Sequence, residues 1–144
     1  MLIGEYLHRM DPKRRVSIPA KMRKVFGERL IITRGLDTCL FLYTQSQWQM
    51  IAGKLSELSM GRTKTRQFVR MMLAGAEEVE LDTLGRVLIP EHLAVYAGLK
   101  GEVVVTGVYT RAEIWAKDAW HTYRTLVTER ADELAEELGS EGVY

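Results

Sequence analysis

Two arginines in this sequence stand at the end of the same short pattern. Arg15 follows Asp11 by four positions, and Arg86 follows Asp82 by the same spacing. An arginine guanidinium can donate two hydrogen bonds to O6 and N7 of guanine, and it also pairs bidentately with phosphate. An aspartate at the start of a turn accepts backbone N–H bonds. The pattern therefore predicts two turns that display an arginine, which contacts DNA, forms a local salt bridge with the aspartate, or does both.

The pattern belongs to a longer internal repeat. Residues 11–19 recur as residues 82–90, with Asp, Arg, Val, Ile and Pro in the same order and an offset of 71 positions (82 less 11). A unit of about 70 residues would be marginally stable alone, so we expect the two copies to complete one core. We predict a single structural domain over residues 1–144. Its two repeats are assigned to residues 5–60 and 76–138.

Each copy is expected to contain two strands around the turn, a short helix that begins at the proline, and two further strands. The predicted strands lie at residues 5–10, 16–18, 30–33, 39–43, 77–81, 87–89, 103–106 and 113–116. The two strands around each turn are expected to pair as a hairpin. The short helix of the second copy is predicted at residues 91–97. Apolar residues at helical spacing predict three longer helices at residues 46–58, 63–74 and 118–138, the first of them with Ser46 as its N-cap.

The net charge is +1, but the charges are unevenly distributed along the chain. Residues 9–24 include seven basic side chains and a single acidic one, Asp11. Lys13 and Arg14 lie in the first predicted turn. The cluster therefore favours contact with a polyanion over an ordinary solvated face. Residues 129–144, by contrast, carry six carboxylates against one arginine.

Catalysis is not expected from these residues. Residues 82–85 resemble the Asp-Thr-Gly of aspartic proteases, but a leucine interrupts the motif and the first copy lacks it. The neighbouring arginine would also hold each aspartate ionised, whereas the protease dyad shares a proton. The three histidines have no metal-ligand spacing, and no glycine-rich phosphate loop occurs. We therefore expect no enzymatic activity, no cofactor and no metal.

The composition is that of a soluble globular protein, with 47% hydrophobic and 27% charged residues. No apolar run approaches the roughly 18 residues that a membrane span needs. The first residues lack the pattern of a secretory signal, and the single Cys39 cannot form an internal disulfide. We expect a cytoplasmic protein without a membrane partner.

Two Asp-x-x-x-Arg turns followed by apolar-x-Ile-Pro, in a chain of this length with helices after each repeat, resemble the MraZ family over nearly the whole sequence. The resemblance implies an α+β fold in which two pseudo-repeats form one swapped-hairpin β-barrel. This barrel is related to AbrB and SpoVT DNA-binding domains, with peripheral α-helices after each repeat. The family consists of transcriptional regulators of the division and cell wall gene cluster. They act on short direct repeats upstream of their own operon and assemble into rings.

The resemblance also assigns roles to residues of the two turns. It implies that Arg15 and Arg86 read bases, and that the two aspartates and Gly85 shape the turns. The first turn departs from the family, because Arg14 stands where a glycine is usual. If that position requires a positive φ, Arg14 carries a strain of about 1 kcal/mol. Its extra charge favours DNA, and with Lys13 we expect it to contact phosphate.

The sequence is therefore interpreted as a sequence-specific, DNA-binding transcriptional regulator, a repressor of its own operon. Its expected partners are double-stranded DNA with promoter direct repeats and further copies of itself in a ring, in the cytoplasm at the nucleoid. Each good bidentate pair supplies about 1–3 kcal/mol of discrimination, so selective binding would require several subunits. The alternative is an oligomeric interaction protein, or a protein that binds nucleic acid without sequence preference.

Overall fold

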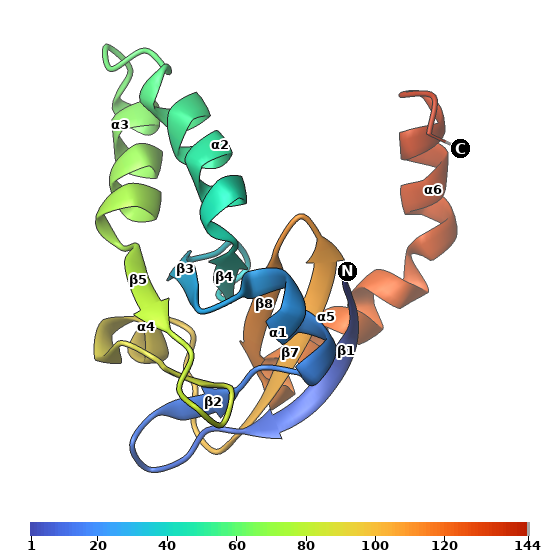
Figure 1. The fold of residues 1–144 in the computed structure, drawn as a ribbon. Helices are drawn as coiled ribbons and strands as arrows, with labels where there is room; N and C mark the ends of the chain where they lie inside the picture. Colours follow the sequence, from blue (N-terminus) through green and yellow to red (C-terminus); the bar gives the residue numbers. More distant parts are fainter. Residues whose placement is uncertain (144) are drawn as a thin grey trace.

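The computed structural model describes residues 1–143 and combines an antiparallel sheet with several helices, as the predicted α+β class requires (Figure 1). Tyr144, the last residue of the predicted domain, lies outside the described residues. The strands are β1 (Leu2–Arg9), β2 (Arg15–Ser17), β3 (Arg29–Arg34), β4 (Leu40–Tyr43), β5 (Glu77–Glu80), β6 (Arg86–Leu88), β7 (Glu102–Tyr109) and β8 (Ala112–Ala116). The helices are α1 (Ala20–Phe26), α2 (Gln45–Ser56), α3 (Thr63–Val69), the π-helical η1 (Arg70–Ala74), α4 (Glu91–Tyr96), α5 (Lys117–Glu129) and α6 (Ala131–Gly139).

The strands form two sheets, and their pairing corrects the prediction of a hairpin around each turn. Six strands are ordered β1-β7-β8-β4-β3-β5, and β2 pairs with β6 in a separate two-stranded sheet. All of these pairs are antiparallel. The strand before each turn therefore pairs in the large sheet, and the strand after it pairs with its counterpart from the other repeat. The ladders of residues 1–143 do not show a closed barrel.

The burial of valine and isoleucine explains why β2 leaves β1 and joins β6. Val16 lies opposite Val87 in the ladder, and both are fully buried. Ile18 and Ile89 follow the two strands and are fully buried as well. The crossed pairing places both sets in one core. That core contains residues of both repeats, as the marginal size of a single repeat predicts.

Two predicted helix boundaries are wrong. Thr44, not Ser46, is the N-cap of α2, because its Oγ1 accepts a hydrogen bond of 3.1 Å from the backbone N–H of Gln47. The helix predicted over residues 118–138 is two helices, α5 and α6, that meet at Arg130. Arg130 leaves the helical region with φ −102° and ψ 13°. Acidic residues in the first turn of α6 favour a new helix start there, because a helix N-terminus attracts negative charge.

The helix predicted over residues 63–74 is present, but its second part is the π-helix η1. A π turn leaves carbonyls without their usual partner four residues later. Here the carbonyl of Met72 accepts a hydrogen bond of 2.7 Å from Oγ1 of the buried Thr33 on β3. The π turn thus joins the α2–α3 helical pair to the large sheet.

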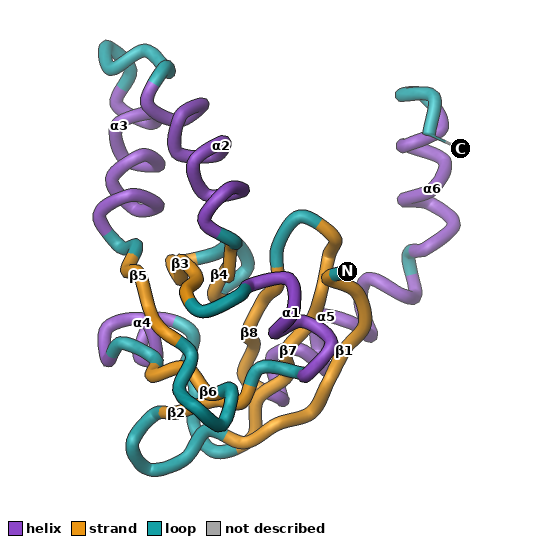
Figure 2. Tube along the Cα trace, viewed as in Figure 1, coloured by secondary structure: helices purple, strands orange, loops and turns teal. Residues whose placement is uncertain are grey.

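The α2–α3 pair and α6 lie at the end of the molecule opposite to the turns. In Figures 1 and 2 the α2–α3 pair and α6 rise as two arms on the same side, while β2, β6 and their turns lie at the other end. Helices α3, α5 and α6 contain no fully buried residue. None of the helices in the described part of the chain is long and apolar enough to cross a membrane.

Candidate nucleic-acid interface

The first turn is organised by the side chain of Asp11. Its Oδ1 accepts hydrogen bonds from the backbone N–H groups of Lys13, at 2.9 Å, and Arg15, at 2.8 Å. The backbone closes the turn, because the N–H of Asp11 donates to the carbonyl of Arg15 at 3.0 Å. An aspartate that accepts from its own turn fixes the backbone without help from the rest of the fold.

The second turn repeats this geometry closely. Oδ1 of Asp82 accepts from the backbone N–H groups of Leu84 and Arg86, both at 2.9 Å. The N–H of Asp82 donates to the carbonyl of Arg86 at 2.9 Å. Two turns with the same hydrogen bonds therefore present the same position for an arginine, as the repeated pattern predicts.

Each turn aspartate also orients its arginine. Nε of Arg15 donates to Oδ2 of Asp11 at 2.6 Å, and Nε of Arg86 donates to Oδ2 of Asp82 at 2.8 Å. The local salt bridges expected from the sequence are thus present. Within residues 1–143 the terminal Nη groups of both arginines have no hydrogen-bond partner. Those nitrogens are left to donate to a guanine edge or a phosphate.

Both turn carboxyls are held ionised. The backbone N–H bond from the arginine is the main cause that lowers the pKa of Asp11 and of Asp82. Desolvation opposes this effect, and the hydrogen bond and positive charge of the guanidinium lower each pKa further. The turns therefore keep their charged form at neutral pH.

The β2–β6 ladder brings the two arginines to one surface. Its register places Arg15 opposite Leu88 and Ser17 opposite Arg86, with Val16 opposite Val87 between them. Directly opposed residues in an antiparallel pair share a face, and alternate residues along a strand do so too. Because the two valines face the core, both arginines lie on the outer face, at diagonal corners of the small sheet.

The fourth residue of each turn, directly before the arginine, has a positive φ, and the two turns meet this requirement differently. Arg14 has φ 60° and its counterpart Gly85 has φ 76°. The strain expected for a non-glycine residue in the first turn is therefore present. Nε of Arg14 donates to the carbonyl of Ile89 at 3.0 Å, so this side chain is held against the protein and not fully extended into solvent.

Sequence reasoning missed the role of Arg23, which makes the equivalent side-chain hydrogen bond beside the second turn. Nε of Arg23, from α1, donates to the carbonyl of Ile18 at 2.7 Å. A Cβ on Gly85 would overlap the Arg23 guanidinium, so Arg23 occupies the space that a side chain at position 85 would take. Sequence offsets of 71 relate Arg14 to Gly85 and Arg23 to Ala94. At each of these two matched pairs, one copy has an arginine and the other has a glycine or an alanine. This pattern was the signal in the sequence that could have indicated the role of Arg23.

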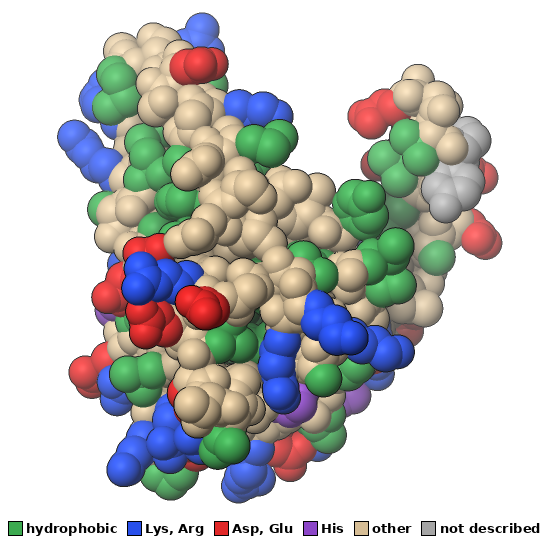
Figure 3. Space-filling model, in the orientation of Figure 1, with side chains coloured by type: hydrophobic (Ala, Val, Ile, Leu, Met, Phe, Trp, Pro, Cys, Tyr) green, Lys and Arg blue, Asp and Glu red, His purple; other side chains and the backbone are tan. Residues whose placement is uncertain are grey.

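Positive side chains gather near the turns. Lys13 is exposed at the tip of the first turn, and Figure 3 shows Lys and Arg side chains at the end of the molecule that carries β2. His8 adds no charge there at neutral pH, because burial and the nearby Arg23 lower its pKa. No group of three metal-ligating side chains occurs among residues 1–143. The surface as a whole suits a polyanion.

Known proteins share both the repeat and the full length of this chain. The family model described as "MraZ protein, putative antitoxin-like" matches twice, over residues 1–71 and 72–138. The transcriptional regulator MraZ of Carboxydothermus hydrogenoformans is 46% identical over 138 residues, which cover 96% of each chain. The proteins of the same name from Syntrophomonas wolfei and Acetivibrio thermocellus are 43% and 44% identical over 99% of this chain and 100% of their own. The two copies of the turn motif, the matched halves and these relatives show that the chain belongs to the MraZ family.

Proposed function

We propose that this protein is a sequence-specific, DNA-binding transcriptional regulator that represses its own division and cell wall operon. It reads promoter direct repeats in double-stranded DNA through its two Asp-x-x-x-Arg turns. The observation that carries this proposal is the diagonal pair of arginines on the β2–β6 face, each oriented by an aspartate through Nε. Relatives that share the whole chain bear the name of a transcriptional regulator.

In the proposed mechanism, different side chains recognise the bases and contact the phosphates. The Nη groups of Arg15 and Arg86 donate to O6 and N7 of guanine in the major groove, while the aspartates fix the plane of each guanidinium. Lys13 and the free nitrogens of Arg14 contact phosphates and supply affinity that does not depend on sequence. Pre-oriented arginines lose little conformational freedom on binding, so more of the contact energy becomes discrimination.

The proposal includes assembly into a ring on the nucleoid. Two base-reading arginines per subunit give limited discrimination, so several subunits on repeated sites are required. Helices α3, α5 and α6 have no fully buried residue, and Phe68, Leu126 and Leu138 on them are exposed. Apolar helix faces of this kind are typical of surfaces that are covered by another subunit. A head-to-tail contact that closes gives a ring.

The test is fluorescence anisotropy with a labelled duplex from upstream of the protein's own gene and a scrambled duplex, over a salt series. We expect the wild-type protein to prefer its own upstream DNA. Arg15→Ala should reduce that preference by about 5- to 150-fold, the equivalent of one lost bidentate pair. Arg130→Ala is the matched control, since Arg130 is also an arginine paired with a carboxylate, Glu133, but lies between α5 and α6, away from the turns.

Circular dichroism and the solution mass should show that Arg15→Ala keeps its fold and its assembly. An Arg15→Ala protein that keeps the full wild-type preference for its own upstream duplex would exclude the first turn as the reader. If the wild-type protein binds both duplexes equally, with affinities that fall together as salt rises, the protein is a nonspecific nucleic-acid-binding protein.

A further inference from the structure

A groove runs beside the first turn, between that turn and the connection from α4 to β7. Two adjoining cavities, of about 510 and 540 Å³, share Met10, Arg14, Leu99 and Lys100 in their walls. Arg9 and Pro12 line one end, and Glu91 and Val95 line the other. The floor is therefore apolar and the rim is charged.

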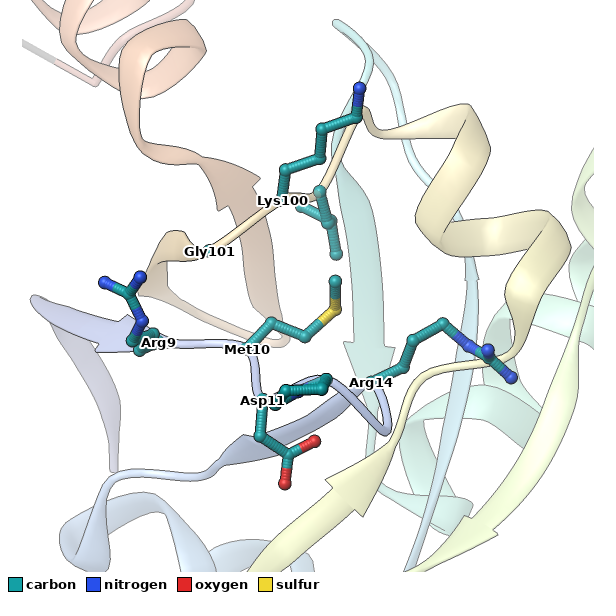
Figure 4. A pocket seen from close by; sticks show the side chains of 8 residues that line it. Arg9, Met10, Asp11, Arg14, Lys100 and Gly101 are labelled. Atoms are coloured by element: carbon teal, nitrogen blue, oxygen red, sulfur yellow. The ribbon is translucent and has the colours of Figure 1, made fainter.

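Three cations surround this floor. Figure 4 shows Arg9, Arg14 and Lys100 placed around Met10, with their charged groups at the rim. Arg9 and Lys100 form no ion pair among the described residues. Of the nearby carboxylates, Asp11 is bound to Arg15, and Glu102, opposite Arg9 in the ladder, is bound to Lys117 at 2.9 Å. Glu91 lies only at the far end of the groove.

The matching positions in the second half carry a different charge among the described residues. The two halves can be aligned at this point by an equivalent backbone hydrogen bond. The N–H of Met10 donates to the carbonyl of Gly101 at 2.7 Å, and the N–H of Leu81 donates to the carbonyl of Glu28 at 2.9 Å. The position of Arg9 is taken by Glu80, and Glu80 is neutralised by Arg29 at 2.8 Å. The connection that carries Lys100 is also longer than its counterpart between α1 and β3. Among the described residues, the first half therefore carries an unpaired arginine where the second half carries a neutralised carboxylate.

We propose that this groove is a subsite for the sugar–phosphate backbone of duplex DNA, with Arg9 and Lys100 as its phosphate contacts. The inference rests on the proposed function. It adds that the two halves of each subunit contact the DNA differently, so that the subunit has a direction along the duplex. Phosphates carry the charge that the rim matches, and deoxyribose presents apolar edges to Met10 and Leu99. Since only one half holds the backbone in this way, each subunit has a defined direction on the duplex. Direct repeats require such a direction.

The test uses the full-length double variant Arg9→Ala/Lys100→Ala with the own-upstream and scrambled duplexes described above. The plot of log affinity against log salt should become less steep by about 1 to 2, because up to two phosphate contacts are lost. The ratio of affinities for the two duplexes should not change. Lys54→Ala/Arg62→Ala is the matched control, since it removes two exposed positive charges from the α2–α3 pair and should keep the wild-type slope.

The outcomes separate this inference from the proposed function. If the groove variant keeps the wild-type slope while Arg15→Ala loses selectivity, the subsite is excluded and the base-reading turns stand. A fall in the selectivity ratio would also overturn the inference, because backbone contacts carry no sequence information. A change of solution mass with an unchanged slope would assign the groove to the acidic C-terminal segment of a second copy, again excluding DNA.

Discussion

The two halves of the molecule place a guanidinium at the same point by different routes. In the first half Arg14 reaches the carbonyl of Ile89 from within the turn, and in the second half Arg23 reaches the carbonyl of Ile18 from helix α1. Both isoleucines are fully buried, and each precedes a proline that opens a helix. A buried carbonyl needs a donor. Both halves therefore place a guanidinium donor at this carbonyl, but the arginine that supplies it comes from different sequence positions in the two halves.

The exchange also distributes backbone strain unequally. With Arg23 supplying the donor, the second turn can use Gly85 at φ 76°, where glycine is unstrained. The first turn has no such arginine on α4, where Ala94 stands, and Arg14 adopts φ 60° to make the contact itself. The aspartate makes the same hydrogen bonds in both turns, whereas the residue directly before the turn arginine varies with the facing helix.

The largest expected effect tests the part that the halves share. Ile18→Ala and Ile89→Ala should each lower the free energy of unfolding by about 2–5 kcal/mol, because both side chains are fully buried in the common core. Urea unfolding measures the change. Leu88→Ala, at an exposed position of β6, is the control and should stay within about 0.5 kcal/mol of the wild type. A large loss in only one isoleucine variant would contradict a core built equally from both repeats.

The second prediction converts one half into the other. Arg23→Ala should cost about 1–3 kcal/mol of stability, because the buried Ile18 carbonyl loses its donor. Gly85→Arg alone should be destabilising, since its side chain overlaps Arg23 and its φ is positive. In the double variant Gly85→Arg/Arg23→Ala the introduced guanidinium can take the vacated place. The double variant should therefore lose less than the sum of the two single changes, by about 0.5–3 kcal/mol.

The mirror variant checks the same point in the first half. Arg14→Gly/Ala94→Arg should also lose less stability than its two single variants together. Urea unfolding of the six variants and the wild type gives both coupling free energies. Strictly additive effects in both halves would show that the two guanidinium positions are not equivalent.

What could be predicted from the sequence follows from the range of the interactions involved. The Asp11 and Asp82 turns depend on hydrogen bonds within five residues, so the repeated motif is sufficient to predict them. The pairing of β2 with β6 could not be predicted in the same way, because it joins residues about 70 positions apart. A hairpin and the crossed pair satisfy the same alternation of Val16 and Ile18, and only packing in the assembled core distinguishes them.

Single side chains that satisfy buried groups were the hardest part to predict. Glu113 looks like a surface carboxylate in the sequence, but on β8 it is buried and accepts hydrogen bonds from Arg111, at 2.9 and 3.0 Å, and from the indole of Trp115 at 3.1 Å. Arg23 is similar, because its place in a basic cluster suggests phosphate contact. In both cases the partner is decided by tertiary structure, and local charge patterns contain no information about it.

The third prediction uses pH to compare the two turn aspartates. The folded-state pKa of each carboxyl lies below its ordinary value, so each stabilises the fold fully above about pH 4. That contribution should be lost as the pH falls through the lowered pKa. Asp11→Asn and Asp82→Asn should therefore melt below the wild type at pH 7, and the difference should narrow progressively as the pH falls below about 4. Thermal unfolding over this range measures it. A difference that is constant with pH, or that grows in acid, would contradict the charged pairs.

The smallest expected effect concerns the tips of the turns. Lys13 and Leu84 occupy matched positions and each gives only a backbone N–H to the turn aspartate, so exchanging their side chains should leave stability within about 0.5 kcal/mol. Lys13→Leu should make the salt dependence of DNA binding less steep by about 1, and Leu84→Lys should make it steeper by about 1, with selectivity unchanged in both. If Leu84→Lys instead lost selectivity, Leu84 would be a base contact, since an exposed apolar side chain can recognise the thymine methyl group. The two turns would then differ in what they read as well as in how they are held.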